Sequence, residues 1–346
     1  MRHALRKILI MARNAVTILD IAEETGVSKS TVANVLSGSG RFSAETADLV
    51  RDAAERMGYV SNRAARSLRT RRSGAFGLFI PPETRTLAFY MEFAFGAARG
   101  AESYSADLTL LSGTRASQTG MHIDGALVID PAGRSPVIER LVAARIPVVS
   151  VGRYEGPEAG GLAGVFEAHH SELQIEVLEH VWGRGRRRPV LLAADRQLPS
   201  RWGIESRETF EAWCAAKGLP ARVVEVPGAG TPREMLEVFS EAIGRHGADA
   251  VVCGAQGWAA RTSILAEQRG LRVGDDLDIV TYVAAPDETA SRGFTAIDLR
   301  PLEYGAEAAR FLGEVVEGQA AGRPEHRYFE GARVVLAGEA KEVGEA

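Results

Sequence analysis

The chain has 346 residues, 45% hydrophobic and 25% charged, which is the composition of an ordinary globular protein of two or three domains. No stretch approaches the roughly 18 uninterrupted apolar residues of a membrane span, and only two cysteines, Cys214 and Cys253, are present. These features exclude collagen-like, disordered, transmembrane and disulfide-framework classes. They favour a reducing cytoplasm, with both cysteines as small buried apolar side chains.

The net charge of −4 is distributed unevenly. Residues 1–73 carry 13 Lys and Arg against 7 Asp and Glu, and the other 273 residues carry 28 against 38. A basic N-terminal part before an acidic body predicts that the first faces a polyanion, which would repel the second.

The first 15 residues are basic, and Arg13 and Asn14 interrupt their short apolar run. No small-residue cleavage site follows, so we expect no signal peptide. We interpret residues 1–15 as a disordered or mis-annotated extension, with translation starting at Met1 or Met11.

Residues 16–60, here called the head, have the pattern of three short helices. Thr17 and Asp20 fit a capping box at the start of the first helix, and Gly26 ends it. Ser28 is placed to cap the second helix, and the third is expected from about Ser43 to Met57. Its expected core face is Leu49, Val50, Ala53, Ala54 and Met57.

The three-residue turn at 25–27 makes the first two helices a helix-turn-helix, whose second helix fits a DNA major groove. On that helix Lys29 suits guanine acceptors or a phosphate, Asn34 suits adenine, and Ser30 suits either kind of edge. The alternative from spacing alone is a three-helix bundle with solvated polar positions.

Residues 16–69 resemble the N-terminal part of the lactose-repressor (LacI/GalR) family of bacterial transcription regulators. The matching residues are Val16-Thr17, Asp20-Ile21-Ala22, Gly26-Val27-Ser28, Thr31-Val32, Val35-Leu36, Ser43, Thr46, Gly58-Tyr59 and Asn62-Arg63-Ala64-Ala65. The resemblance implies DNA contacts by Thr17, Ser28, Lys29, Ser30, Thr31, Asn34, Tyr59, Asn62, Arg63, Ala65, Arg66 and Leu68. The family usually has Arg where Asn34 stands, so we expect this chain to read a different base there.

Within a hinge or linker segment at 61–73, Asn62 to Arg69 match the family's hinge helix, which orders in the minor groove when dimer and operator are both present. The resemblance makes Leu68 the wedge between base steps, and Ala65 allows close approach to the groove. Five arginines of this segment would lie near DNA phosphates, namely Arg63, Arg66, Arg69, Arg71 and Arg72. Ser61 stands where the family often has Pro, which predicts a more flexible entry. A solvated basic linker is the alternative.

Residues 74–346 alternate apolar strand runs with segments of helical period, which predicts two doubly wound α/β lobes with parallel sheets. Strands are expected at 74–80, 107–111, 125–129 and 147–151, then at 190–193, 222–226, 250–254, 277–283 and 294–298. Helices are expected near 88–104, 137–144, 171–184, 201–217, 232–246, 258–269 and 301–317.

This core resembles the same family's periplasmic-binding-protein-like core, more loosely than the head does. We assign about 74–163 and 296–325 to the first lobe, and about 164–295 and 326–346 to the second. Between Leu111 and Asp124 only about a dozen residues stand where the family usually has a further helix, so we expect that helix to be lost.

The pocket implied by the resemblance departs from the family. Relatives have ligand-contacting Asp and Asn residues where this chain has His169-His170, Ala255-Gln256 and Val283 or Ala284. Losing these groups argues against a sugar effector. Arg207 is kept, and an arginine without carboxylate neighbours suits an anionic or flat aromatic effector. The candidate effector-binding residues are Phe89, Tyr90, Arg153, His169, Arg207, Gln256 and Trp258. A decayed pocket without an effector is the alternative.

No Gly-x-Ser-x-Gly elbow, Walker loop or His-Glu-x-x-His motif occurs, so we expect no enzyme, no cofactor and no metal. We expect a cytoplasmic, nucleoid-associated transcription regulator, favoured as a repressor. It would bind a pseudo-palindromic operator as a homodimer, and a small non-sugar effector in the cleft between the lobes would modulate this binding. No leucine heptads follow Leu336, which favours a dimer over a tetramer. A transporter's solute-binding protein is the alternative class, against which the head and the missing export signal count.

Overall fold

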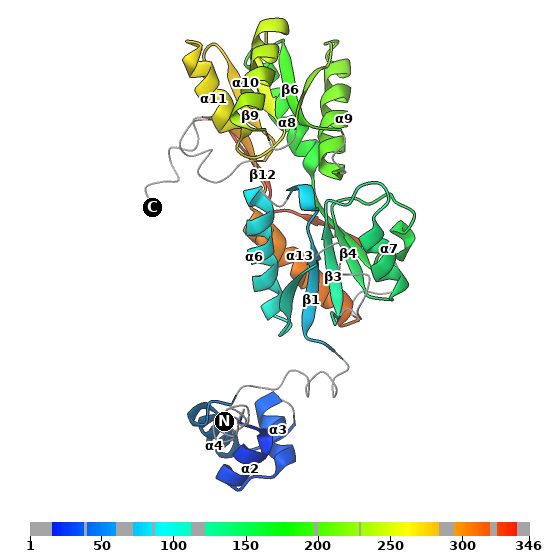
Figure 1. Ribbon diagram of the computed structural model, residues 1–346, viewed down its shortest axis with the longest axis vertical. Coiled ribbons are helices and arrows are strands. Elements are labelled where there is room, and N and C mark those ends of the chain that lie inside the picture. Colours follow the sequence, from blue (N-terminus) through cyan, green and yellow to red (C-terminus); the bar gives the residue numbers. More distant parts are fainter. Residues whose placement is uncertain are drawn as a thin grey trace, which may run out of the picture. The chain divides into compact units, whose positions relative to one another are not determined.

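The computed structural model describes residues 16–37, 40–59, 72–84, 87–111, 122–196, 200–227, 230–283, 294–318 and 324–337. The chain divides into two compact units, residues 1–71 and 72–346, which Figure 1 shows. The expected extension at 1–15, nearly all of the expected hinge and the stretch at 112–121 lie outside the described residues. No described helix is long and apolar enough to cross a bilayer.

The head forms the three predicted helices, α2 (Ile18–Thr25), α3 (Lys29–Ser37) and α4 (Ala44–Arg56). The predicted capping box forms, because the Thr17 hydroxyl accepts from the Asp20 amide and the Asp20 carboxylate accepts from the Thr17 amide. Ser28 Oγ accepts from the Thr31 amide at 3.2 Å, which caps α3. Gly26 ends α2 with a φ of 68°, a conformation that a side chain would strain.

One apolar cluster holds the three helices together. Its buried members come from all three, and they are Ile21, Val32, Val35, Ala47, Val50, Ala53 and Ala54. The prediction that Leu49 belongs to this cluster is wrong, since Leu49 is 46% exposed. A helical residue is rotated by about 100° from its neighbour, so Val50 and Leu49 point to different sides of α4.

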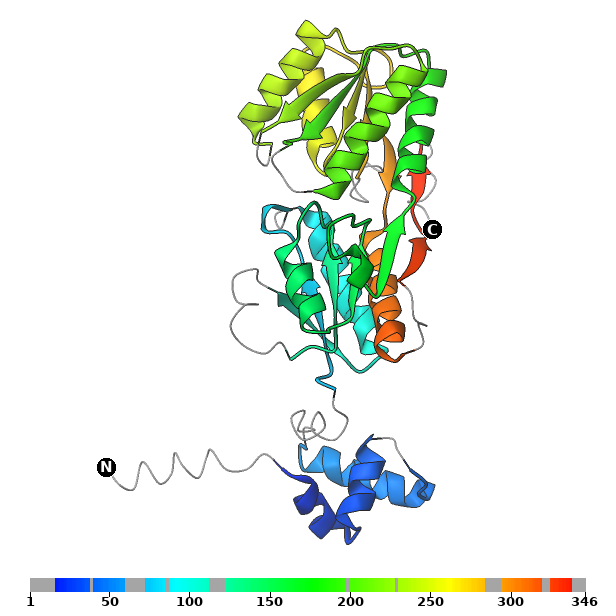
Figure 2. The ribbon, with the colours of Figure 1, turned by 90° about the vertical axis from the view of Figure 1, so that its right-hand side faces the viewer.

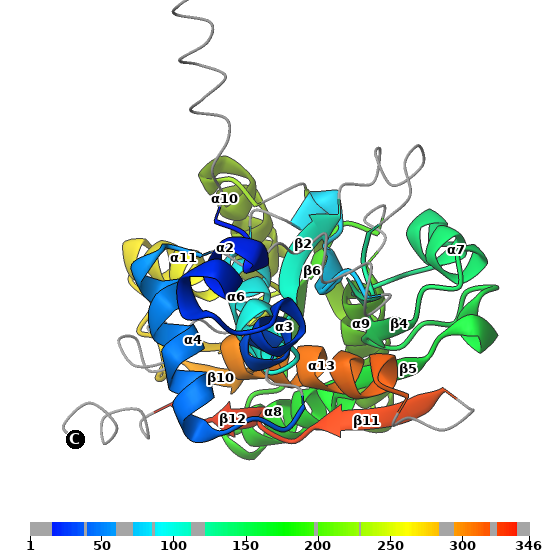
Figure 3. The same cartoon turned by 90° about the horizontal axis from the view of Figure 1, so that it is seen from below.

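The first lobe of the core contains a six-stranded sheet in the order β11-β5-β4-β3-β1-β2. All its strand pairs are parallel. Figure 3 shows β11 along the edge of this sheet, next to β5. The strands are β1 (Ala75–Phe79), β2 (Asp107–Leu111), β3 (Gly125–Ile129), β4 (Val148–Val151), β5 (Gly164–Ala168) and β11 (Glu325–Phe329).

Helices cover both faces of this sheet. Alternate residues of β1, β3 and β4 pack against α6 (Ala88–Glu102) and α13 (Pro301–Val316), and the others pack against α7 (Pro136–Ala143). Figure 1 shows α6 and α13 on one side and α7 on the other. Burial on both faces explains why these strands read as uninterrupted apolar runs.

The second lobe has a six-stranded sheet in the order β12-β10-β9-β8-β6-β7, parallel except where β12 pairs with β10. Its strands are β6 (Pro189–Ala194), β7 (Arg222–Val226), β8 (Ala250–Cys253), β9 (Asp278–Thr281), β10 (Thr295–Asp298) and β12 (Arg333–Val335). Its helices are α8 (His170–Gly183), α9 (Arg201–Ala216), α10 (Pro232–Ser240), which a π-helical turn (Glu241–Arg245) continues, and α11 (Trp258–Gln268). Cys214 and Cys253 are both buried in this lobe, as expected. The predicted fold class is confirmed.

The chain passes between the lobes three times, after β5, β10 and β11 (Figure 2). The sheets place β5 in the first lobe and β10 in the second, so these passages lie a few residues later than the expected boundaries at 163/164 and 295/296. The strands β5, β11 and β12 were not predicted. Each contains charged residues or is very short, so none has an apolar run.

Candidate nucleic-acid interface and interlobe cavity

Helix α3 presents the predicted base-reading residues outward. Lys29, Ser30 and Asn34 are all exposed, while Val32 and Val35 on the opposite side are buried in the head. The sequence of α3 contains no Asp or Glu, whereas α2 and α4 carry all seven carboxylates of residues 16–60. A polyanion would therefore meet the least repulsion along α3.

The positive charge of the N-terminal part lies outside these helices. Residues 16–60 carry 4 Lys and Arg against 7 Asp and Glu, so the basic excess of residues 1–73 comes from the segments on either side. The head by itself is acidic, so the expectation that residues 1–73 face a polyanion through their positive charge applies to the flanking segments and not to the three helices. The five arginines from Arg63 to Arg72 and the four cations of residues 1–15 carry the basic excess.

The other predicted DNA contacts are placed as follows. Thr17 and Ser28 are exposed at the N-termini of α2 and α3, where their hydroxyls serve as caps. Thr31 is half-buried on α3, and Tyr59 packs against the apolar cluster of the head just after α4. Five predicted contacts lie outside the described residues, namely Asn62, Arg63, Ala65, Arg66 and Leu68.

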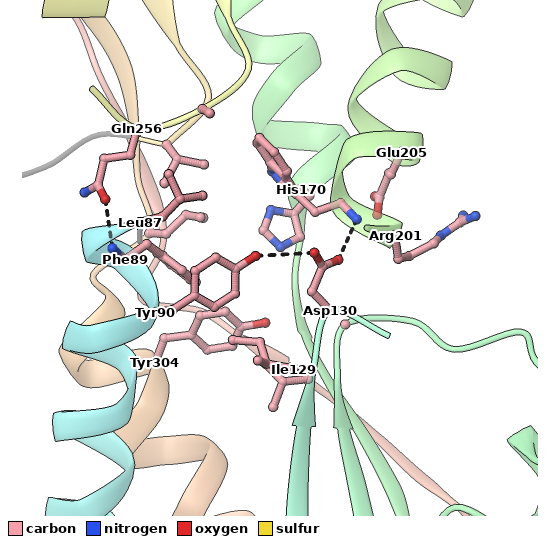
Figure 4. Close-up of a pocket in the computed structure, with 16 residues that line it drawn as sticks. Leu87, Phe89, Tyr90, Ile129, Asp130, His170, Arg201, Glu205, Gln256 and Tyr304 are labelled. Atoms are coloured by element: carbon pink, nitrogen blue, oxygen red, sulfur yellow. Dashed lines mark hydrogen bonds between the residues drawn. The ribbon is translucent and has the colours of Figure 1, made fainter. Parts of the chain in front are cut away.

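An interlobe cavity of about 60 Å³ lies where the carboxyl ends of the strands of both lobes meet. Its lining is mostly apolar and aromatic. Phe89, Tyr90 and Tyr304 line it from the first lobe (Figure 4), and Trp202 and Val283 line it from the second. Ligand pockets usually measure about 300–1,000 Å³. The described lobes therefore enclose room for a few waters.

Asp130 is the main polar group of this cavity, and sequence reasoning missed it. It follows β3 and its carboxylate accepts from three groups: Ser200 Oγ at 2.6 Å, the Trp202 amide at 2.8 Å and Tyr90 Oη at 3.3 Å. Burial raises the pKa of this carboxyl to about 6, although the hydrogen bonds oppose the shift. Its place at the carboxyl end of a parallel strand is the signal that would have found it.

Gln256 follows β8 and faces the cavity from the second lobe. Its Oε1 accepts from the Phe89 amide at 2.8 Å, in the first turn of α6, as Figure 4 shows. The structure thus brings Phe89, Tyr90 and Gln256 together. The side-chain oxygen of Gln256, however, accepts a hydrogen bond from the first lobe, opposite its own.

Two other candidates, Arg153 and His169, line an adjoining groove of about 600 Å³, which shares His170, Arg201 and Glu205 with the interlobe cavity. Arg153 pairs with Glu167 at 3.5 Å, and the His169 ring stacks on Tyr328 at 4.2 Å between centroids. Among the described residues, no three His, Cys, Asp or Glu side chains come together as metal ligands.

Arg207 and Trp258 do not line the interlobe cavity, which corrects their predicted role. The Arg207 guanidinium pairs with Glu225 of β7 at 3.1 Å, so the premise that it lacks a carboxylate neighbour fails. Trp258 is 4% exposed and packs in the second lobe's apolar core. Helical spacing alone did not reveal which way either side chain points.

Two family models match the chain. "Bacterial regulatory proteins, lacI family" matches residues 17–62, and "Periplasmic binding protein-like domain" matches residues 178–336. The maltose regulon regulatory protein MalI of Escherichia coli (strain K12) is 34% identical over 220 residues, covering 59% of this chain and 61% of MalI. The HTH-type transcriptional regulator CelR of Thermobifida fusca is 24% identical over 334 residues, covering 89% of this chain and 94% of CelR.

Solved structures agree over almost the whole length. The lac repressor dimer bound to operator and the anti-inducer ONPF matches with a TM-score of 0.75 at 19% identity, covering 94% of this chain and 99% of that one. The chain belongs to the lacI family of bacterial regulatory proteins. The relatives of this lacI-family chain are transcription regulators and not enzymes. A CelR–cellobiose complex matches with a TM-score of 0.65 at 21% identity, covering 92% and 98%.

Proposed function

We propose that this lacI-family regulator binds operator DNA by inserting α3 into the major groove. The observation that carries the proposal is the outward display of Lys29, Ser30 and Asn34 on the one head helix without a carboxylate. Asn34 has the donor and acceptor pair that adenine requires, and Lys29 reaches guanine or a phosphate. Such a regulator works in the cytoplasm, as a repressor that blocks transcription by occupying its operator.

The arginines at 63–72 supply the phosphate contacts, because the folded head has a carboxylate excess. Leu68 is proposed to wedge between base steps and bend the operator centre. Two heads occupy half-sites about one helical turn apart, which makes the operator a pseudo-palindrome.

Replacing Asn34 by alanine should relax base choice at one position of each half-site, costing about 1–3 kcal/mol on the preferred base and little on the others. Arg66→Ala should instead weaken binding to all sequences and reduce the salt dependence. Gel-shift titrations on matched and scrambled operators distinguish the two roles. Identical behaviour of both variants on both DNAs would contradict the assignment.

Exposed apolar side chains on α6, α11 and the edge strand β2 support the homodimer. Phe95 of α6 is 64% exposed and Leu110 of the edge strand β2 is 61% exposed. In the second lobe Ile264 of α11 is 42% exposed, and Figure 1 shows α6 and α11 on the same side of the core. Large exposed apolar groups that gather on one side are typical of protein interfaces.

We expect Phe95→Glu to weaken dimerisation by at least tenfold, because each copy of a two-fold interface would gain a buried charge. Ile204→Glu is the matched control, since Ile204 is also exposed but lies on α9, on the other side of the core. Sedimentation velocity over a concentration series measures the change. An equal loss in both variants, or none in either, would place the interface elsewhere.

We further propose that the effector is a small, flat, mostly apolar molecule. The cavity's aromatic lining supports this class. An anion is less suited, because Asp130 already occupies the α9 N-terminus and Glu225 pairs with Arg207. A thermal-shift screen tests the class: aromatic compounds should raise the melting temperature, and a response to sugars alone would overturn it.

A further inference from the structure

Two helices begin at the interlobe cavity, and their first-turn amides need acceptors. Helix α6 of the first lobe follows Leu87, whose side chain supplies no cap. Helix α9 of the second lobe follows Ser200, whose hydroxyl accepts from the Gly203 amide and leaves the Trp202 amide to another group.

Each helix receives its missing acceptor from the opposite lobe. Gln256 of the second lobe accepts from the Phe89 amide of α6, and Asp130 of the first lobe accepts from the Trp202 amide of α9. Asp130 also accepts from Ser200 Oγ. A third contact between the lobes joins Arg201 to Glu155 at 3.5 Å.

We propose that Asp130 and Gln256 form a reciprocal capping latch, which holds the two lobes closed without any effector. Both caps face helix N-termini, where an acceptor gains most from the helix dipole. The chain thus supplies the contacts across the cleft that a bound ligand would otherwise make. An effector too large for the closed cavity must first break this latch.

The backbone at Asp130 agrees with this role. Its φ is 51°, in the left-handed region that a residue other than glycine adopts at a cost. Opening the lobes would leave the Asp130 carboxylate and the two amides to water. In the closed form, their hydrogen bonds have to offset the cost of the left-handed backbone at Asp130. The hydrogen bonds that Asp130 accepts across the cleft, from Ser200 Oγ and the Trp202 amide, contribute to offsetting that cost.

Hydrogen exchange tests the latch. One cap is removed by mutation, and the exchange rate is measured at the amide that the other cap accepts from. In the full-length protein Gln256→Ala should speed exchange of the remote Trp202 amide by tenfold or more, because one closure protects both amides. Asp130→Gly, which relieves the positive φ, should do the same to the Phe89 amide. The matched control is Asp249→Ala, since Asp249 also accepts from two backbone amides, of Arg187 and Arg188, but within one lobe.

If each variant speeds only its own partner amide, or neither amide changes, the caps are local and the latch is refuted. The inference rests on the proposed function only where closure is linked to DNA. Operator affinity of the same variants is therefore measured separately. Faster remote exchange with unchanged operator affinity would keep the latch and contradict regulation through the cleft.

Acidification should strengthen closure. Burial raises the pKa of Asp130 to about 6 from 3.8, so the closed form holds the proton more tightly than the open form, where the carboxyl is in water. Between pH 7.5 and pH 5 the titration of Asp130 alone should therefore shift the closure equilibrium by up to about tenfold toward closed. The groups around this carboxyl are Tyr90, Tyr304, Arg201, Glu205 and His170, and burial lowers the pKa of His170, which opposes the shift.

Small-angle scattering at both pH values measures closure directly. Asp130→Asn keeps an acceptor for the Trp202 amide but cannot titrate, so it isolates the contribution of Asp130 from that of His170. Between pH 7.5 and pH 5, wild type should shift further toward the closed form than this variant does. Equal pH responses in the two proteins would show that Asp130 does not carry the effect.

Discussion

Val50→Asp should abolish specific DNA binding, with a loss of at least 100-fold, and leave the two-lobed core folded. Val50 is fully buried among the three head helices. A carboxylate there would lose its hydration without gaining a partner, which costs several kcal/mol. A domain as small as the head has about that much stability in total, so it should unfold.

Leu49→Asp is the matched control for this prediction. Leu49 precedes Val50 on the same helix but is 46% exposed, so its charge stays in water and binding should change little. Calorimetry of both variants should show the same core transition as wild type, since the head and the core are separate compact units. If Leu49→Asp also abolished binding, Leu49 would be part of the interface or of the head's core.

Gly305→Val should destabilise the first lobe by about 3 kcal/mol or more. A Cβ at Gly305 would lie 2.1 Å from the Phe93 carbonyl oxygen, and one at Gly96 would lie 2.0 Å from that of Leu302. The α6 and α13 backbones are therefore in direct contact, and only glycine fits at the crossing. Pushing them apart would also displace Phe89 and Tyr90, which line the cavity from α6.

Glu307→Val on the exposed side of α13 controls for the lower helix propensity of valine, which costs well under 1 kcal/mol. Urea unfolding measures both variants. A change at Gly305 no larger than that at Glu307 would mean that the helices separate at little cost, contrary to the packing described.

Most of the fold was predictable because its strands are buried on both faces. Runs such as residues 125–129 are apolar throughout, and the intervening helices have clear caps or apolar periodicity. The strand β11 escaped prediction because a sheet edge tolerates charged residues, as in Glu325-His326-Arg327. The contact between α6 and α13 left a signal in the small residues Gly96, Ala97 and Gly100, which was not used.

The site was less predictable than the fold. Caps and helical period placed Lys29, Ser30 and Asn34 on the exposed side of α3. In the cavity, Phe89 and Tyr90 follow from their position at the start of α6, but the acceptor for the Trp202 amide of the second lobe is Asp130, 72 residues earlier in the chain. Such a pairing depends on how two lobes close, which local sequence does not encode. Arg207 of α9 was mispredicted for a similar reason. Its partner Glu225 lies on β7, and the helical pattern around Arg207 does not reveal that contact.

The central claim is that α3 reads DNA while the arginines at 63–72 hold its phosphates. Its most direct test is equilibrium binding of the full-length protein to a fragment selected from genomic DNA, and to a scrambled copy, at 50 and 200 mM salt. The account predicts a clear preference for the selected fragment, and an affinity that falls by roughly 10³-fold or more over this range. Equal binding to both DNAs, or an affinity that salt leaves unchanged, would contradict it.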